Sequence, residues 1–186
     1  MQHAYFFGYG SLVNRMTHGF TPVHRARVSG WRRAWRAVPE RDLCVLTAVA
    51  DPAGEIDGLI APVPEEGWAA LDLREAAYER HEATGDVRHA ARAEQIAIYA
   101  VSPARGRAPG PDNPILLSYL DVVIEGYLAE YGRAGAEAFF DTTAGWQAPI
   151  LDDRAAPRYV RATRPEPEVR AIVDAALARL GSRFAA

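Results

Sequence analysis

A glycine-rich segment near the start of the chain carries residue types that suit the binding of an anionic group. Residues 5–12 read YFFGYGSL, an apolar run followed by Gly8, Tyr9, Gly10 and Ser11. Such a run, ended by glycines, predicts a buried strand that feeds a tight turn. Because glycine lacks a Cβ, the backbone at Gly8 and Gly10 can take positive φ and can approach a ligand closely. Successive N–H groups in such a turn can bind a carboxylate or an oxyanion.

The same glycines do not complete a known phosphate-binding loop. A dinucleotide fingerprint needs its third glycine at position 13, which is Val13. A Walker A loop needs a lysine, and all 21 basic residues of this chain are arginines. From the glycine spacing alone, an ordinary strand-to-turn junction is the simpler interpretation.

The other candidate nucleophiles and metal ligands form no known constellation. No two of the five histidines have the spacing of a zinc site; they are His3, His18, His24, His81 and His89. His81 and Glu82 begin like a zincin helix, but Gly85 stands in place of the second histidine. The only cysteine, Cys44, lies in an apolar run, where we expect a buried, inert thiol. The sequence therefore predicts no metal site and no Ser- or Cys-based hydrolase.

Positive charge is concentrated at the start of the chain. Residues 1–41 hold seven arginines against Glu40 alone, whereas the whole chain has a net charge of −3. The stretch 31–36 (WRRAWR) interleaves aromatic and guanidinium groups, as a stacking surface for single-stranded nucleic acid does. Alternatively, these arginines lie on paired strands and face water or the acidic remainder of the chain. The mildly acidic composition favours this second interpretation.

The length and composition of the chain are typical of a compact globular enzyme. At 186 residues, of which 49% are hydrophobic, residues 1–186 are expected to form a single domain. No apolar stretch approaches the ~20 residues that cross a membrane, and the first apolar run lacks the basic flank of a signal peptide. We therefore expect a cytoplasmic protein that does not enter a membrane.

Strand patterns come first along the chain and most helix patterns come later, which predicts the α+β class. The predicted strands cover residues 4–8, 25–28, 31–38, 43–50, 55–63 and 94–101, with a hairpin turn at 51–54. A helix is predicted to open at 64–66, with Trp68, Leu71 and Tyr78 among its apolar positions. A loop is expected at 102–114, followed by helices at 115–131, 134–140 and 168–180, the last ended by Gly181.

Several of these segments resemble one known family. The hexapeptide from Phe7 to Leu12 resembles the YGSL/YGSN signature of the γ-glutamylcyclotransferase-like superfamily, which includes the ChaC enzymes and the γ-glutamylamine cyclotransferases. Further similar segments follow in family order at 28–38, 45–60, 68–78, 98–100 and 152–159. The segments at 13–15 and 105–114 differ from the ChaC pattern, which argues against strict glutathione specificity.

The resemblance implies both a fold and an activity. The fold would be a small mixed or antiparallel β-barrel surrounded by α-helices. The activity would be cyclisation of the γ-glutamyl group of an amine, amino acid or peptide to 5-oxoproline. The substrate brings its own nucleophile, the α-amine, so neither a metal nor a cofactor is implied. A base must take the ammonium proton, and N–H donors must hold the carboxylate or the developing oxyanion.

The family's site residues can be matched to this chain one by one. Glu75 matches the catalytic glutamate and would act as general acid/base. Gly8, Tyr9, Gly10, Ser11 and Leu12 match the binding turn. Tyr99 matches a tyrosine of the pocket. Judged without the resemblance, Glu75 is a solvated glutamate beside Arg74, and Tyr99 is a core tyrosine with a satisfied hydroxyl.

Two alternatives from other classes stay open. One is a non-catalytic small-molecule binding module on the same fold, and the other is an arginine-rich nucleic-acid-binding domain. The preferred prediction is a γ-glutamylcyclotransferase whose partner is a small-molecule γ-glutamyl substrate, with no nucleic acid and no membrane. It is compatible with a homodimer. The sequence does not identify the leaving amine.

Overall fold

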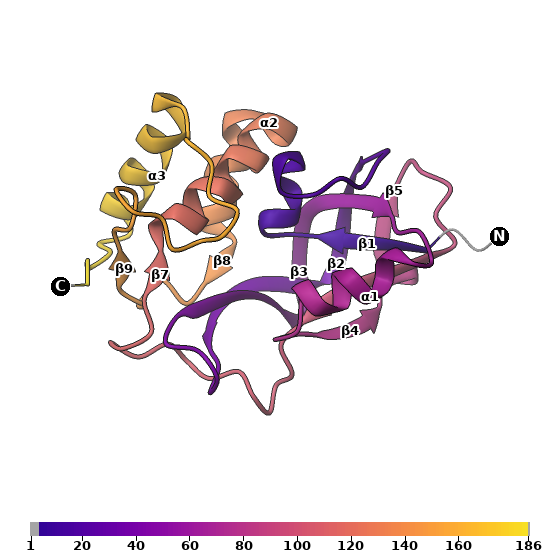
Figure 1. Cartoon of the computed structure of the whole chain (residues 1–186), viewed down its shortest axis with the longest axis horizontal. Helices are drawn as coiled ribbons and strands as arrows, with labels where there is room; N and C mark the ends of the chain where they lie inside the picture. Colours follow the sequence, from indigo (N-terminus) through magenta and orange to yellow (C-terminus); the bar gives the residue numbers. More distant parts are fainter. Residues whose placement is uncertain (1–3, 186) are drawn as a thin grey trace.

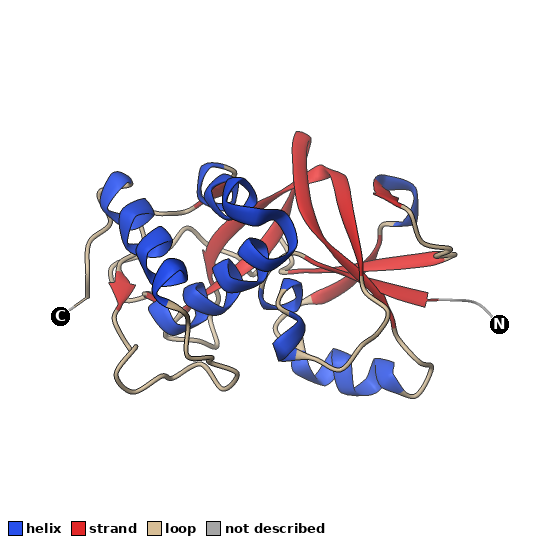
Figure 2. Cartoon of the chain, turned by 90° about the horizontal axis from the view of Figure 1, so that it is seen from above, coloured by secondary structure: helices blue, strands red, loops and turns tan. Residues whose placement is uncertain are grey.

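The computed structural model describes residues 4–185, in which a curled, mixed β-sheet packs against helices (Figures 1 and 2). The sheet has the strand order β4–β6–β1–β3–β2–β5, and β8 pairs with β2. Its strands are β1 (Ala4–Gly8), β2 (His24–Ala37), β3 (Cys44–Pro62), β4 (Glu79–Glu82), β5 (Val87–His89), β6 (Gln95–Ala100) and β8 (Thr143–Ala144). The predicted α+β class with a barrel-like sheet is confirmed; the sheet is open, with β4 and β5 at its ends.

Three α-helices and a small second sheet complete the part of the chain that the structure describes. The helices are α1 (Gly67–Arg74), α2 (Leu117–Asp141) and α3 (Pro167–Arg179). Short β7 (Ile115–Leu116) and β9 (Ile150–Leu151) pair in parallel, and the 3-10 turns are η1 (Ser11–Val13), η2 (Arg15–Thr17) and η3 (Thr84–Asp86). Figure 1 shows α2 and α3 together beside the sheet, with α1 near β1 and β4. None of the helices within residues 4–185 has the length and apolar character to cross a bilayer.

β1 is the central strand, as its continuous apolar run predicts. It pairs antiparallel with β3 and parallel with β6, so both of its edges are satisfied. Because successive side chains point to opposite faces, its two phenylalanines enter different cores. Phe7 packs in the larger core with residues of α2 and α3, such as Val123 and Ile172. Phe6 packs under α1 against Leu71.

β2 and β3 form one long antiparallel ribbon, which overturns the predicted hairpin turn at 51–54. Both halves of β3 pair with β2. Residues 55–60 of β3 pair with 24–29 of β2, and residues 44–50 of β3 pair with 31–37 of β2. The four turn-type residues therefore bulge out opposite Gly30, whose φ is +82°. β2 is 14 residues long and offers a partner to both halves, so a bulge replaces the turn.

The helix predictions are confirmed, with changes at the start of α2 and at both ends of α1. α2 contains a non-helical residue, Gly132 (φ 66°, ψ −172°), which separates the two helical stretches predicted at 115–131 and 134–140. Its first predicted residues, 115 and 116, form β7 instead. α3 lies where it was predicted, and Gly181 follows it with φ +65°. α1 begins only at Gly67 and ends at Arg74, so placing Tyr78 on this helix was wrong.

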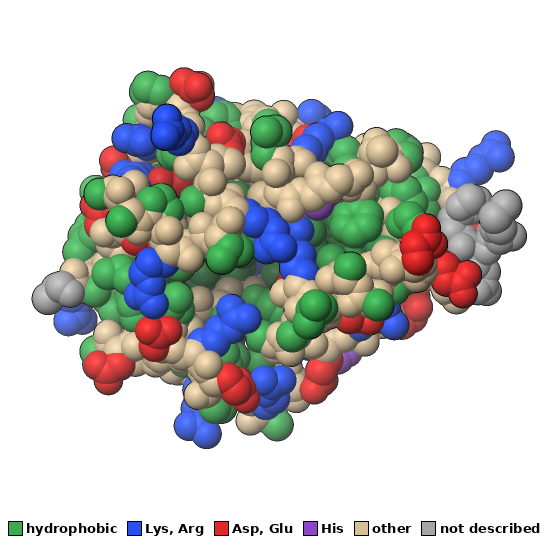
Figure 3. Space-filling model, in the orientation of Figure 1, with side chains coloured by type: hydrophobic (Ala, Val, Ile, Leu, Met, Phe, Trp, Pro, Cys, Tyr) green, Lys and Arg blue, Asp and Glu red, His purple; other side chains and the backbone are tan. Residues whose placement is uncertain are grey.

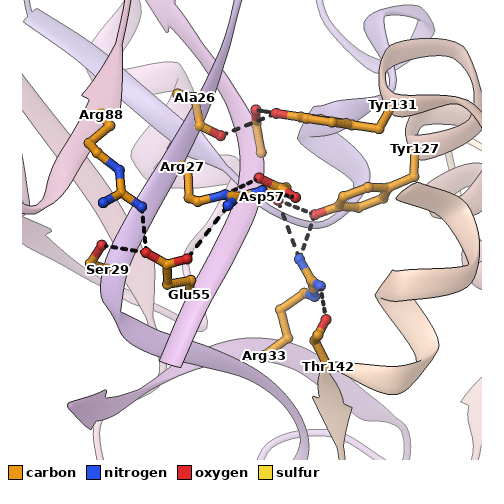
Figure 4. Close-up of polar contacts among 11 residues, drawn as sticks. Ala26, Arg27, Ser29, Arg33, Glu55, Asp57, Arg88, Tyr127, Tyr131 and Thr142 are labelled. Atoms are coloured by element: carbon orange, nitrogen blue, oxygen red, sulfur yellow. Dashed lines mark hydrogen bonds and ion pairs between the residues drawn. The ribbon is translucent and has the colours of Figure 1, made fainter. Parts of the chain in front are cut away.

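Two arginines of β2, Arg27 and Arg33, are engaged within the protein (Figure 4). Arg27 Nε lies 2.6 Å from Asp57 Oδ1. Arg33 is only 2% exposed and donates to Tyr127 Oη (2.8 Å) and Thr142 Oγ1 (2.5 Å). These two arginines therefore meet groups of the same chain, as the second interpretation of the basic segment expects; whether the segment binds nucleic acid stays a prediction.

Candidate active site

A pocket at the end of β1 brings together every residue that the resemblance assigned to a site. Its lining comprises Phe7, Gly8, Tyr9, Gly10, Ser11, Leu12, Leu46, Glu75, Tyr78, Tyr99 and Tyr119. These side chains come from β1, η1, β3, β6, α2 and the segment after α1. Leu46, Tyr78 and Tyr119 were not predicted as site residues.

The glycines of the turn are required for close packing rather than for positive φ. Neither Gly8 nor Gly10 uses the positive φ that glycine allows: neither is among the positive-φ glycines, and Gly10 has φ −120°. A Cβ on Gly8 would stand 2.5 Å from the Cβ of Leu12, and one on Gly10 would stand 2.7 Å from Tyr119 Oη. Both distances are shorter than real Cβ contacts, so the turn accepts only glycine without rearrangement.

The turn continues directly into η1. The N–H groups of Val13 and Asn14 donate to the carbonyls of Gly10 (2.9 Å) and Ser11 (3.1 Å). The N–H groups of Ser11 and Leu12 precede this first hydrogen-bonded turn and make no backbone hydrogen bond within residues 4–185. The Ser11 N–H lies near the Tyr119 phenol, whose raised pKa it partly offsets. N–H groups at a pocket wall suit a carboxylate or an oxyanion.

Glu75 is positioned by the end of α1. Its N–H donates to the Leu71 carbonyl (2.9 Å), and its carbonyl accepts from the N–H of Tyr78 (2.8 Å). The side chain is 16% exposed, and Arg74 Nε lies 3.1 Å from its Oε1. Burial raises the pKa of Glu75 above its ordinary value, although the positive charges of Arg74, Arg161 and Arg41 oppose this. A raised pKa makes a carboxylate a better proton acceptor, so Glu75 is suited to general acid/base chemistry.

Arg74 connects the carboxylate to the glycine turn. Its Nη1 donates to the carbonyl of Thr17 (2.9 Å), and its Nη2 approaches Ser11 Oγ (3.3 Å). Thr17 Oγ1 in turn donates to the carbonyl of Ser11 (2.8 Å). The side chain of Arg74 is 11% exposed, so these contacts hold a largely desolvated guanidinium in place. Glu75 and the turn thus belong to one hydrogen-bonded unit.

Three tyrosines surround the carboxylate. Tyr9 Oη donates to the carbonyl of Tyr99 (2.5 Å), and Tyr78 Oη donates to the carbonyl of Leu46 (2.9 Å). Tyr119 Oη faces Gly10. Burial raises the pKa of all three phenols, and the nearby Glu75 charge adds to the effect. The phenols therefore stay protonated and can only donate or accept hydrogen bonds.

Tyr99 lines the pocket, but its hydroxyl is directed away from Glu75. It donates to Asp72 Oδ1 (2.5 Å), and burial together with this carboxylate raises the pKa of Tyr99. Its carbonyl accepts from Tyr9, so its contribution to the site is mainly positional.

The single cysteine and the possible metal ligands of residues 4–185 bear on thiol and metal chemistry. Cys44 Sγ donates to the carbonyl of Asn113 (2.9 Å), and burial raises the pKa of this thiol to about 12. Within residues 4–185, no three His, Cys, Asp or Glu side chains gather as metal ligands would. The predicted absence of a metal stays a prediction.

The unpredicted residues come from distant parts of the chain. Tyr119 stands on a helix, where apolar spacing gives no signal for a pocket residue. Tyr78 was named as an apolar helix position, and Leu46 as strand material. Leu46 and Tyr119 reach the pocket because β3 and α2 both pack on η1.

Comparison with solved structures identifies the fold. A protein described as a gamma-glutamyl cyclotransferase matches at TM-score 0.55 and 13% identity, over 94% of this chain and 99% of that one. An uncharacterised human protein matches at TM-score 0.59 and 14% identity with the same coverage. A yeast gamma-glutamyl cyclotransferase specific to glutathione matches at TM-score 0.51 and 15% identity, over 96% of this chain and 97% of that one. This chain has the γ-glutamylcyclotransferase-like fold. No protein-family model and no curated protein sequence matches it.

Proposed function

We propose that this protein, which has the fold of the γ-glutamyl cyclotransferases, is itself a γ-glutamylcyclotransferase. It would cyclise the γ-glutamyl group of an amine, amino acid or peptide to 5-oxoproline, with Glu75 as general acid/base. The observation that carries the proposal is the position of Glu75: a buried carboxylate with a raised pKa, in one pocket with the residues of the glycine turn.

The reaction requires little else from the protein. The α-ammonium of the substrate gives a proton to Glu75, and the freed amine attacks the γ-carbonyl carbon. A C–N bond closes the five-membered ring, the γ-amide C–N bond breaks, and the leaving nitrogen takes up a proton. The base and the correct placement of the amine supply most of the acceleration. No cofactor or metal enters this scheme.

The glycine turn would hold the negatively charged part of the substrate. The N–H groups of Ser11 and Leu12 are the candidate donors, and Tyr119 Oη lies beside them. We expect a small-molecule γ-glutamyl substrate, a cytoplasmic location, and no binding of nucleic acid or membranes. A homodimer is compatible with the scheme.

The deciding experiment incubates the protein with γ-glutamyl amino acids, γ-glutamyl alkylamines and glutathione, and measures 5-oxoproline. Glu75→Gln keeps the size of the side chain but removes the base, so turnover is expected to fall by about 10²–10⁴. The matched control is Glu66→Gln, the same change at the exposed beginning of α1. Folded Glu75→Gln protein with wild-type turnover would rule out this role. Binding without 5-oxoproline would identify the protein as the non-catalytic module.

A further inference from the structure

A second hollow, with a volume of about 910 Å³, lies at the other end of β1 from the candidate active site. Ala4, the first residue of β1, lines the second hollow, whereas Gly8, the last, lines the candidate active site. Four residues of extended strand place these two residues roughly 13 Å apart. The rest of the lining comes from the segment before β2, the end of β3, the beginning of α1 and the first residue of β6. Within residues 4–185 the two sites share no lining residue.

Most of the wall of the second hollow is apolar, and it includes two aromatic rings, Phe20 and Trp68. Phe20 packs edge-on against Phe6 of β1, with the ring centroids 5.4 Å apart. Trp68 is half-buried on α1. Gly67 keeps the two walls close, because a Cβ at this position would stand 3.7 Å from the Phe20 ring. A hollow of this size with aromatic walls is suited to the apolar body of a small organic molecule.

The charged side chains in the described part of this lining are two exposed glutamates, Glu65 and Glu66. Glu66 directly precedes α1 but makes no side-chain capping hydrogen bond. Among residues 4–185, no arginine or histidine lies within ion-pair distance of either carboxylate; Arg80, the cation nearest the Trp68 ring, pairs with Asp72 (3.4 Å). On the face in Figure 3, acidic side chains lie beside exposed hydrophobic ones at the end where β1 begins. The second hollow thus joins apolar walls to negative charge, which favours a cationic ligand.

We propose that the second hollow binds a small organic ammonium compound, with its apolar body between Phe20 and Trp68 and its charged nitrogen against Glu65. Glu65 and Trp68 both line the second hollow and an adjoining one of about 440 Å³, so a carboxylate and an indole ring meet at the border of the two. An ammonium group is attracted to both, by ion pairing with the carboxylate and by a cation–π interaction with the ring. A ligand that carries a carboxylate instead is repelled by Glu65. This inference does not depend on the proposed function.

The test uses three compounds with the same phenylbutyl body: 4-phenylbutylamine, 4-phenylbutanol and 5-phenylpentanoate, which end in an ammonium, a hydroxyl and a carboxylate. Calorimetry on the full-length protein should show that the amine binds about three- to tenfold more tightly than the alcohol, and that the acid binds most weakly. Glu65→Gln, a change at an exposed residue, should lower the amine-to-alcohol affinity ratio by about twofold or more and leave the alcohol affinity unchanged. Trp68→Ala should weaken the binding of all three compounds, because it removes apolar contact area.

Two variants serve as controls for the position of the bound amine. Glu166→Gln, the same change at the exposed residue before α3, and Glu75→Gln, in the candidate active site, should both leave the three affinities unchanged. A loss of amine binding in the Glu75→Gln protein would place the amine in the candidate active site and overturn the inference. A preference for the amine that survives Glu65→Gln would overturn it as well. Binding of none of the three compounds would mean that a second copy or another part of the chain fills the second hollow, and the inference would be wrong.

Discussion

At the scale of single residues, Glu75 is stabilised in its neutral form by its surroundings. Burial raises its pKa more than Arg74, Arg161 and Arg41 lower it. A carboxyl group whose pKa is higher in the folded than in the unfolded chain binds its proton more tightly when folded. Its contribution to stability is therefore fully present below the unfolded-state pKa and is lost as pH rises through the folded-state value.

Glu75→Gln should accordingly stabilise the protein above that pH range, because the amide carries no charge to desolvate. Thermal melts should show a higher Tm than wild type at about pH 8, with the difference closing toward about pH 4. Glu66→Gln serves again as the control and should follow the wild-type curve. A variant less stable than wild type by the same amount at every pH would contradict the raised pKa.

The close contact between Gly10 and Tyr119 predicts a compensating pair of substitutions. Gly10→Ala places a Cβ 2.7 Å from Tyr119 Oη and should cost about 1–3 kcal/mol in the free energy of unfolding. Tyr119→Phe removes that oxygen, and the next neighbour, Leu46 Cδ2, is 3.3 Å away. In the double variant we expect roughly 1 kcal/mol or more of this cost to be recovered, measured by urea denaturation.

Ser11→Ala is the milder change in the same turn. It keeps the backbone N–H groups and removes only the 3.3 Å contact with Arg74.

The double variant also decides whether Gly10 and Tyr119 constrain each other. If the effects of Gly10→Ala and Tyr119→Phe on the free energy of unfolding were simply additive, the two residues would not constrain each other.

At the scale of elements, Gly132 determines where the long helix α2 breaks. Its φ of 66° and ψ of −172° lie in a region that is almost confined to glycine. Gly132→Ala should destabilise the protein by about 1–3 kcal/mol in chemical denaturation. Gly19→Ala is a matched control because both positions leave open space for a Cβ, and Gly19 has no positive φ. Equal effects of the two substitutions would show that backbone conformation at Gly132 is not the cause.

Elements whose pattern is local could be predicted from the sequence. β1 is a continuous apolar run with partners on both sides, and α3 has an apolar stripe and a glycine stop. The long β2–β3 ribbon could not be predicted. Its turn-type residues are locally indistinguishable from a hairpin, and the length of the partner strand decides the outcome. Two-residue strands such as β7 contain no period to detect.

The candidate site also contains residues that could be predicted from the sequence and residues that could not. Glu75 and the glycine turn have a short sequence signature, and they do lie in one pocket. Leu46, Tyr78 and Tyr119 reach the pocket from a strand, an irregular segment and a helix far apart in the chain. Their proximity depends on tertiary packing, for which a single sequence carries no local signal.

Arg33 links the sheet to α2 (Figure 4) and, through Tyr127, to the pocket. It donates to Tyr127 Oη, and Tyr127 Oη in turn donates to the carbonyl of Tyr9 (2.9 Å), between the two turn glycines. It also holds Thr142 and Thr143, at the end of the helix. A buried cation with several acceptors thus supports the turn from behind.

Arg33→Met should remove these charged hydrogen bonds while keeping much of the side-chain volume. We expect a loss of about 2–4 kcal/mol in the free energy of unfolding, measured in urea. Arg32→Met, the exposed neighbour with a looser 3.5 Å pair to Asp51, should change it by less than about 1 kcal/mol. Similar losses for both variants would show that the buried network is not what distinguishes Arg33.

The packing of Tyr119 has an optical consequence. Its ring meets that of Trp35 edge-on, with centroids 5.9 Å apart, while its hydroxyl faces the glycine turn. Trp35 is 1% exposed, and its indole is shielded from bulk solvent. Any ligand that displaces the Tyr119 phenol therefore changes the surroundings of a buried fluorophore. The intrinsic emission of the unlabelled protein can thus report occupancy of the pocket, even for compounds that are never turned over.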